Sequence, residues 1–214
     1  MDIDILNPYV AKIIISTRDE DSINAIAHRI GLSYGWTYNW VKKLADVGVF
    51  RETRTKLFLN TESPFYKRVL GFVKESFRDD VSFHYSVLQL FGIKYCFTKT
   101  DAAFVWTDGG YNIARYSGHY PIFIKLAESD EVRFKAYCHK LGLKTNSGSG
   151  VYYTVELLQD FSVSEHKGVP VDSLDDTIAF MKENIYNFEP ALEMVQDLYK
   201  KKLGVKYAEV VSNV

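Results

Sequence analysis

Hydrogen-bonding and cationic side chains gather in one short stretch of this sequence. The hydroxyl and amide groups come first, on Ser33, Tyr34, Thr37, Tyr38 and Asn39. The cations follow, on Lys42, Lys43, Arg51, Arg54 and Lys56. Hydroxyls and amides can exchange hydrogen bonds with base edges, whereas lysines and arginines match phosphates. This combination indicates recognition of DNA, with the polar group reading bases and the cations holding the backbone.

The stretch from Tyr34 to Asn60 is positively charged although the chain as a whole is not. It holds five lysines and arginines against two carboxylates, Asp46 and Glu52, whereas the whole chain has a formal charge of −1. A local cationic face on a near-neutral protein is typical of a regulator and not of a protein that coats nucleic acid. One alternative stays open: a small helical domain whose lysines are simply solvated.

The pattern around these residues predicts two helices and a hairpin. Ser22 can cap a helix that Gly31 ends. After a turn over residues 32–35, a second helix is expected over 36–47, followed at 49–59 by a hairpin with a cationic tip. In the second helix, apolar residues recur at helical spacing, namely Trp36, Trp40, Val41 and Leu44. This is the element order of a winged helix-turn-helix, whose second helix enters the major groove of DNA.

A further helix is expected before this pair, and a domain boundary after it. Asn7 can cap the helix and Pro8 suits its first turn, so the helix would complete a three-helix core. The acidic run 19–21 would end it. The polar, proline-containing segment 61–64 is the best boundary. We therefore expect a DNA-binding domain over 1–62 and a C-terminal domain over 63–214.

The composition bounds the class of protein. The chain has 214 residues, of which 47% are hydrophobic, and this is ample for a real core. Its two cysteines, Cys96 and Cys138, are too few for a disulfide framework. There is no long apolar run, and the start of the chain, 1–4, is acidic where a secretory signal would be basic. The sequence predicts a cytoplasmic protein that does not enter a membrane.

Residues 63–214 mix helical and strand patterns, which predicts an α+β fold. Strands are expected at 95–97, 120–126 and 151–155, and helices at 65–77, 102–106, 130–141 and two from 174 onward interrupted at 187–190. The helix over 65–77 has three open interpretations: a linker, a dimerisation helix or a core helix.

The order of these elements resembles that of transcriptional regulators related to the AbiEi antitoxins, especially archaeal ones. The resemblance covers most of the chain and includes the segment 170–178, Pro-Val-Asp-Ser-Leu-Asp-Asp-Thr-Ile. It implies an N-terminal unit that binds operator DNA and a C-terminal unit with a nucleotidyltransferase-like fold that has lost catalysis. It also implies a cognate protein partner as one alternative role.

The residues themselves argue against nucleotidyl transfer. That reaction needs a glycine-serine turn followed by paired aspartates on a strand, because two metal ions must bridge the transferred phosphate. The nearest turn, Ser117-Gly118, precedes a strand over 120–124 that has no acidic residue. A second turn at 148–150 precedes Tyr152 and Tyr153, with Glu156 alone beyond them. We expect no catalytic residues.

No cofactor or metal is expected either. Cys138 and His139 are adjacent, which is poor geometry for one zinc ion. The segment 108–112 contains two glycines but lacks the lysine and hydroxyl of a P-loop, so a turn is the better interpretation.

These observations predict a sequence-specific DNA-binding transcriptional regulator. A homodimer on double-stranded DNA is expected, because one short helix reads few base pairs and two-fold pairing doubles the site. Two alternatives remain open: an antitoxin-type protein that acts mainly by binding a partner protein, and a nucleotidyltransferase-like enzyme.

Overall fold

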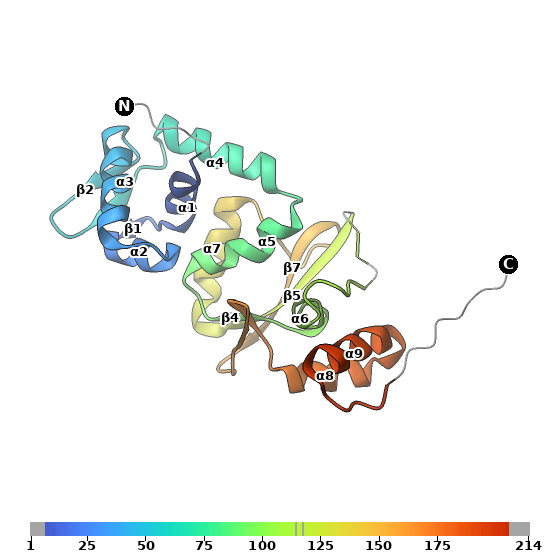
Figure 1. Cartoon of the computed structure of the whole chain (residues 1–214). Helices are drawn as coiled ribbons and strands as arrows, with labels where there is room; N and C mark the ends of the chain where they lie inside the picture. The colour runs from blue at the N-terminus through green and yellow to red at the C-terminus, as the bar shows by residue number, and fades with distance from the viewer. Residues whose placement is uncertain (1–6, 114, 117, 206–214) are drawn as a thin grey trace. The chain divides into compact units, whose positions relative to one another are not determined.

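A computed structural model describes residues 7–205 of the chain, apart from residues 114 and 117. The acidic start of the chain and Ser117 of the glycine-serine turn lie outside these residues. Helices and two β-sheets occur together, which confirms the mixed α+β class (Figure 1). None of the described helices combines the length and the apolar character needed to cross a membrane.

The chain forms two compact units. The first contains Met1–Ile93 together with Val132–Leu143, and the second contains Lys94–Glu131 and Lys144–Val214. The expected boundary near residue 62 therefore coincides with a turn but not with the end of the first unit. The physical reason is that Phe65, Tyr66 and Val69 beyond this turn belong to the same buried cluster as the residues before it.

The first unit is mainly helical, with one small sheet. Its elements are α1 (Pro8–Ser16), β1 (Glu20–Asp21), α2 (Ile23–Ile30), α3 (Tyr34–Asp46), β2 (Phe50–Glu52), β3 (Leu57–Leu59), α4 (Pro64–Phe77), α5 (Val81–Val87), the 3-10 turn η1 (Leu88–Phe91) and α7 (Glu131–Leu141). The sheet is antiparallel, in the order β1-β3-β2.

The helix starts in this unit follow the capping signals of the sequence. The Asn7 side chain accepts a hydrogen bond from the Tyr9 N–H at 2.9 Å, and Ser22 accepts one from Ala25 at 3.2 Å. Gly31 ends α2 in the left-handed region, with φ of 68°, where a side chain would be strained. These three predictions are confirmed, as is the hairpin formed by β2 and β3.

Two local expectations for this unit were wrong. The helix α3 begins at Tyr34 and not at Trp36, because Ser33 supplies its cap. The acidic run does not end α1, which stops at Ser16; instead Glu20 and Asp21 pair with β3 as a short strand. A two-residue strand depends on its distant partner for its backbone hydrogen bonds, so a local sequence pattern cannot predict it.

The core of the first unit is built around α1, which has three fully buried branched residues in one turn and a half: Val10, Ile13 and Ile14. They belong to a cluster that draws on α2, α3, the hairpin and α4; its other buried members are Ile26, Ile30, Val41, Leu44, Val49, Phe50, Leu57, Phe65, Tyr66 and Val69. Each fully buried aliphatic side chain contributes about 1.5–3 kcal/mol. The helix α4 is thus a core helix, as one of the three interpretations held.

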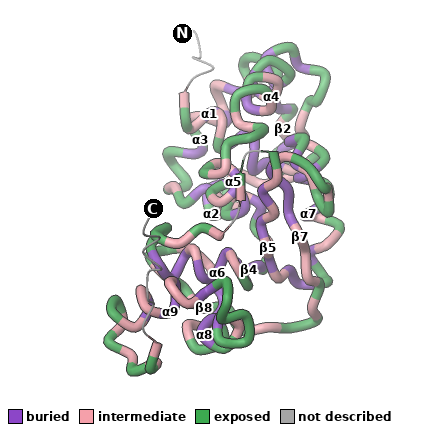
Figure 2. Tube along the Cα trace, turned by 90° about the vertical axis from the view of Figure 1, so that its right-hand side faces the viewer, coloured by how far each residue is buried: buried purple, intermediate pink, exposed green. Residues whose placement is uncertain are grey.

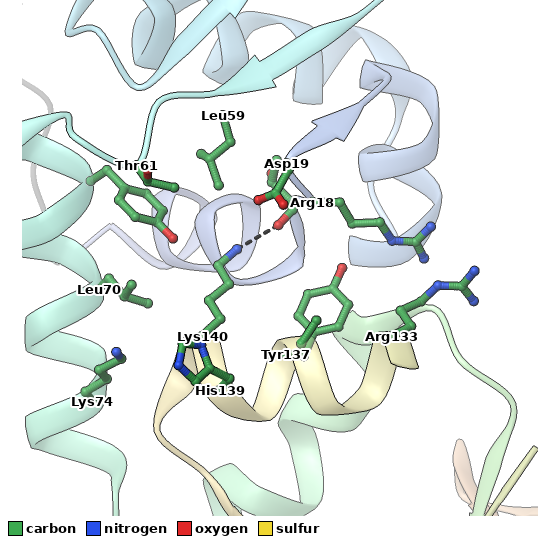
Figure 3. A pocket seen from close by; sticks show the side chains of 13 residues that line it. Arg18, Asp19, Leu59, Thr61, Leu70, Lys74, Arg133, Tyr137, His139 and Lys140 are labelled. Carbon is green, nitrogen blue, oxygen red and sulfur yellow. Dashed lines mark hydrogen bonds between the residues drawn. The ribbon is translucent and has the colours of Figure 1, made fainter. Parts of the chain in front are cut away.

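The helix α7 is tied to the C-terminal end of α1 by polar groups. Lys140 Nζ donates to the carbonyl oxygens of Ile14, at 2.6 Å, and Thr17, at 2.7 Å, with a longer bond of 3.2 Å to Ile15. Figure 3 shows this side chain reaching from α7 toward the chain that follows α1, beside a cavity of about 550 Å³. Because α1 ends with unpaired carbonyls and a partial negative charge, an ammonium group suits this position.

The second unit contains a six-stranded sheet and the remaining helices. Its elements are β4 (Tyr95–Phe97), α6 (Lys99–Trp106), β5 (His119–Ala127), the 3-10 turn η2 (Glu128–Asp130), β6 (Lys144–Thr145), β7 (Gly150–Leu158), β8 (Ser164–His166), β9 (Val169–Val171), α8 (Leu174–Glu183) and α9 (Ile185–Tyr199). The strand order is β6-β7-β5-β4-β9-β8.

The centre of this sheet is the parallel pair β5 and β7, which stay in register over nine residues from His119↔Gly150 to Ala127↔Leu158. Buried residues alternate along most of β5 and occupy the first half of β7, at Val151, Tyr152 and Tyr153 (Figure 2). In β5 the residues Tyr120, Ile122, Ile124 and Leu126 alternate with less buried ones, as expected for a strand with period two. The three strands predicted in this region are confirmed.

The break between the last two helices was placed wrongly. It was expected at 187–190, but it falls at Asn184, and Pro190 lies inside α9. Proline removes one helical hydrogen bond. On both sides of it the buried residues Phe188, Ala191, Leu192 and Val195 continue at helical spacing, so burial offsets that loss.

The enclosed ammonium of Lys140 predicts a pH-dependent stability. Burial lowers the pKa of Lys140 to about 7, against the opposing effect of Asp19. The unfolded chain then binds more protons than the folded chain between pH 7 and about 10, so the free energy of unfolding rises with pH across this window. The slope from this one group is at most about 1.4 kcal/mol per pH unit.

Lys140→Met should remove this slope, and chemical denaturation followed by tryptophan fluorescence at several pH values would measure it. Lys135→Met, an exposed position on the same helix, is the control and should keep the wild-type slope. Parallel curves for wild type and Lys140→Met would show that Lys140 does not titrate in this range.

Candidate nucleic-acid interface

A groove of about 520 Å³ lies between α3, the start of α2 and the β2–β3 hairpin. Tyr34, Tyr38 and Lys42 of α3 form one wall, and Glu52 and the hairpin tip face them. Helical geometry places Tyr34, Tyr38 and Lys42 on one face, because residues four apart are neighbours on a helix. The groove therefore brings together half of the ten residues that the sequence predicts to contact DNA, namely Tyr34, Tyr38, Lys42, Arg54 and Lys56.

The two tyrosines are open to solvent. Tyr34 is 53% exposed and Tyr38 is 39% exposed, and their rings stack with centroids 6.2 Å apart. The Lys42 ammonium lies 5.3 Å from the Tyr38 ring. Two phenol hydroxyls and an amphipathic aromatic surface are thus presented beside a cation, and such groups can hydrogen-bond to or stack on bases.

The apolar pattern read in α3 holds at Val41 and Leu44 but not at Trp36. Thr37, Val41 and Leu44 are buried, whereas Trp36 is 47% exposed. Trp36 instead packs edge-on against Tyr9, at 5.6 Å between ring centroids. The inward face of α3 therefore contains Thr37 together with Val41 and Leu44, and Trp40 is partly buried at the edge of the same cluster.

Two of the predicted base-reading residues have structural roles. Thr37 is fully buried, and its hydroxyl donates to the Ser33 carbonyl at 3.0 Å, so its assignment to the DNA surface was wrong. Ser33 is exposed, but its hydroxyl caps α3 by accepting from the Trp36 N–H at 3.3 Å. Asn39 is exposed, and its contact with bases stays a prediction.

The cations of this region are less free than their sequence indicates. Lys42 pairs with Glu52, and this hydrogen bond raises the pKa of Lys42. Lys56 pairs with Glu20. Lys43 lies 4.4 Å from the ring of Trp40, away from the groove residues, and Arg51 stacks on Phe58 at 5.1 Å.

Arg54 differs from these four cations. It is exposed at the hairpin tip and lines the groove, and neither an ion pair nor a ring contact joins it to any other residue that the structure describes. An unpaired guanidinium with five donors is well suited to a phosphate.

Two contributors to this surface were not assigned to it from the sequence. Glu20 reaches the hairpin only through the pairing of β1 with β3. The first turn of α2, at Ile23 and Asn24, lines the groove, and backbone N–H groups at a helix start attract anions. The capping residue Ser22 located this helix start in the sequence, but nothing there indicated that it lies beside the hairpin.

In the second unit the buried carboxylates are used by the protein itself. Asp101 accepts from Arg115 Nη1 at 2.7 Å and from the Phe123 N–H at 2.7 Å. Asp172 accepts from the Thr98 hydroxyl and pairs with Lys125 at 2.8 Å. Within the described part of the chain, no three histidine, cysteine or acidic residues come together as a metal site.

The two cysteines are buried and free. Burial raises the pKa of Cys96, which lies beside the Asp172 carboxylate, and raises the pKa of Cys138 to about 12. Both thiols are therefore protonated at neutral pH, which does not favour them as nucleophiles.

Comparison with known proteins finds no significant similarity: no family model, no curated protein and no solved structure matches the chain.

Because Ser33 caps α3, replacing it should loosen the helix start that carries Tyr34 and Tyr38. Ser33→Ala is expected to lower the free energy of unfolding by about 1 kcal/mol. Ser33→Asp keeps a capping oxygen and should retain wild-type stability. Thermal and chemical denaturation would compare the three proteins, and an unchanged Ser33→Ala variant would contradict the capping role.

Proposed function

We propose that this protein is a sequence-specific DNA-binding transcriptional regulator. In this proposal the first unit contains a winged helix-turn-helix formed by α2, α3 and the β2–β3 hairpin. The N-terminal half of α3 enters the major groove, and the tip of the hairpin is the wing that lies against the backbone, while the end of β2 stays beside α3. The cellular site of action is the cytoplasm.

The observation that carries the proposal is the groove between α3 and the hairpin. It combines exposed Tyr34 and Tyr38 with the unpaired guanidinium of Arg54 and the start of α2. A major groove about 12 Å wide accepts a single α-helix, and phosphate contacts from a hairpin and a helix start then fix its orientation. The contact residues that we propose are Tyr34, Tyr38, Asn39, Lys42, Lys43, Arg51, Arg54 and Lys56.

We further propose that the second unit has a nucleotidyltransferase-like arrangement without catalysis, in keeping with the resemblance to AbiEi-related regulators. Its mixed sheet with the parallel pair β5 and β7 supports the first part. The second part is supported by Asp101 and Asp172, which already hold Arg115 and Lys125 and so are poorly placed to bind the metal ions of phosphoryl transfer.

DNA binding can be tested with a triple variant, Tyr38→Ala, Asn39→Ala and Arg54→Ala, in a mobility-shift or anisotropy assay on duplex DNA. Loss of base contacts should cost about 1–3 kcal/mol for each contact, which is about 5- to 150-fold in affinity. Loss of Arg54 alone should make the salt dependence shallower by about one unit of slope.

The control for this test is Tyr186→Ala, which removes a fully exposed tyrosine of the second unit. It should bind DNA as the wild type does. If the triple variant keeps both its affinity and its salt dependence, the assignment of α3 to the major groove is refuted.

We propose that the protein binds its operator as a homodimer, since one recognition helix reads a short sequence and two half-sites are spaced by about 34–36 Å, one turn of DNA. Light scattering should give two chains per duplex, and footprinting should give a two-fold symmetric protected region. One chain per duplex with a single short footprint would contradict the dimer.

A further inference from the structure

Lys42 and Glu52 form an ion pair inside the groove. Lys42 lies on α3, one turn beyond Tyr38, and its ammonium donates to Glu52 Oε2 at the end of β2. The two side chains are 44% and 23% exposed, respectively. A cation that the proposed function assigns to the DNA backbone is therefore engaged by a carboxylate of the protein when no DNA is bound.

The other oxygen of this carboxylate makes Glu52 more dependent on Lys42. Glu52 Oε1 is buried and has no hydrogen-bond partner among the described residues. A desolvated carboxylate oxygen without a donor is unfavourable, so Lys42 supplies the main compensation for this charge. If Lys42 moved to a phosphate, Glu52 would lose that compensation and would also face a second negative charge.

We propose that Glu52 is a specificity-determining residue. On most DNA sequences Glu52 keeps its ion pair with Lys42, so Lys42 cannot bind a phosphate; only a sequence that supplies another hydrogen-bond donor to Glu52 releases Lys42. The inference rests on the proposed DNA-binding function. In the major groove the amino group of cytosine is a donor that a glutamate can accept from. A site with this group in reach replaces Lys42 as the partner of Glu52, and Lys42 is then free to hold the backbone.

The competing explanation is that Glu52 merely lowers the positive charge of the surface. Glu62 separates the two ideas, because it also forms an ion pair with a lysine, Lys67 at 2.6 Å, but is 80% exposed and does not line the groove. Glu52→Gln and Glu62→Gln each remove one negative charge from the same unit, so their general electrostatic effects match. Only Glu52→Gln releases Lys42.

The experiment measures binding of the full chain to a fluorescently labelled duplex of arbitrary sequence at several salt concentrations. The proteins are wild type, Glu52→Gln, Glu62→Gln, Lys42→Met and the double variant Glu52→Gln/Lys42→Met. Thermal denaturation of each variant checks that it is folded. The same proteins are then compared on a duplex that the wild type selects from a random library.

Glu52→Gln should bind the arbitrary duplex about 3- to 10-fold more tightly than wild type, with a salt slope steeper by about 0.9, the value for one added phosphate contact. Glu62→Gln should change the affinity by less than about 2-fold. In the Lys42→Met background the gain from Glu52→Gln should vanish. The preference for the selected duplex should fall in Glu52→Gln.

Equal effects of Glu52→Gln and Glu62→Gln, or a gain that persists without Lys42, would overturn the inference while the DNA-binding function stands. Weaker binding by Glu52→Gln would also overturn it. If none of the five proteins binds duplex DNA at low salt, the proposed function fails and this inference fails with it.

Discussion

The first unit depends on the burial of α1. Val10, Ile13 and Ile14 are fully buried, and the cluster around them includes Val41 and Leu44 of α3. This packing fixes which face of α3 points inward. The groove face with Tyr34 and Tyr38 is then outward by geometry, since a helix that buries one stripe must expose the opposite side.

Two lysines of the first unit, Lys140 and Lys42, lie in opposite electrostatic environments. At the end of α1 the Lys140 ammonium meets three carbonyl oxygens and is enclosed, so its pKa falls to about 7. In the groove Lys42 is held by Glu52 at the surface, and its pKa rises. The first lysine is a structural link that burial makes costly, whereas the second stays charged and remains within reach of a ligand.

The second unit uses its carboxylates in a different way. Asp101 and Asp172 lie buried in the sheet region and accept several hydrogen bonds each, including those from Arg115 and Lys125. Such networks orient side chains and help to specify one packing, and removing one partner would leave a buried charge. This role accounts for the aspartates without assigning chemistry to them, and it agrees with the proposal that the unit does not catalyse nucleotidyl transfer.

The sequence by itself determined the α+β class, the caps at Asn7 and Ser22, the hairpin and the central strands, because these follow from local hydrogen bonding and hydrophobic period. Tertiary structure decided what local pattern could not. The pairing of β1 with β3 brought Glu20 to Lys56, and the packing of α3 turned Thr37 inward and left Trp36 at the surface. Tertiary structure also determined which cations of the groove remain without a carboxylate partner, because distant carboxylates such as Glu20 fold against its lysines.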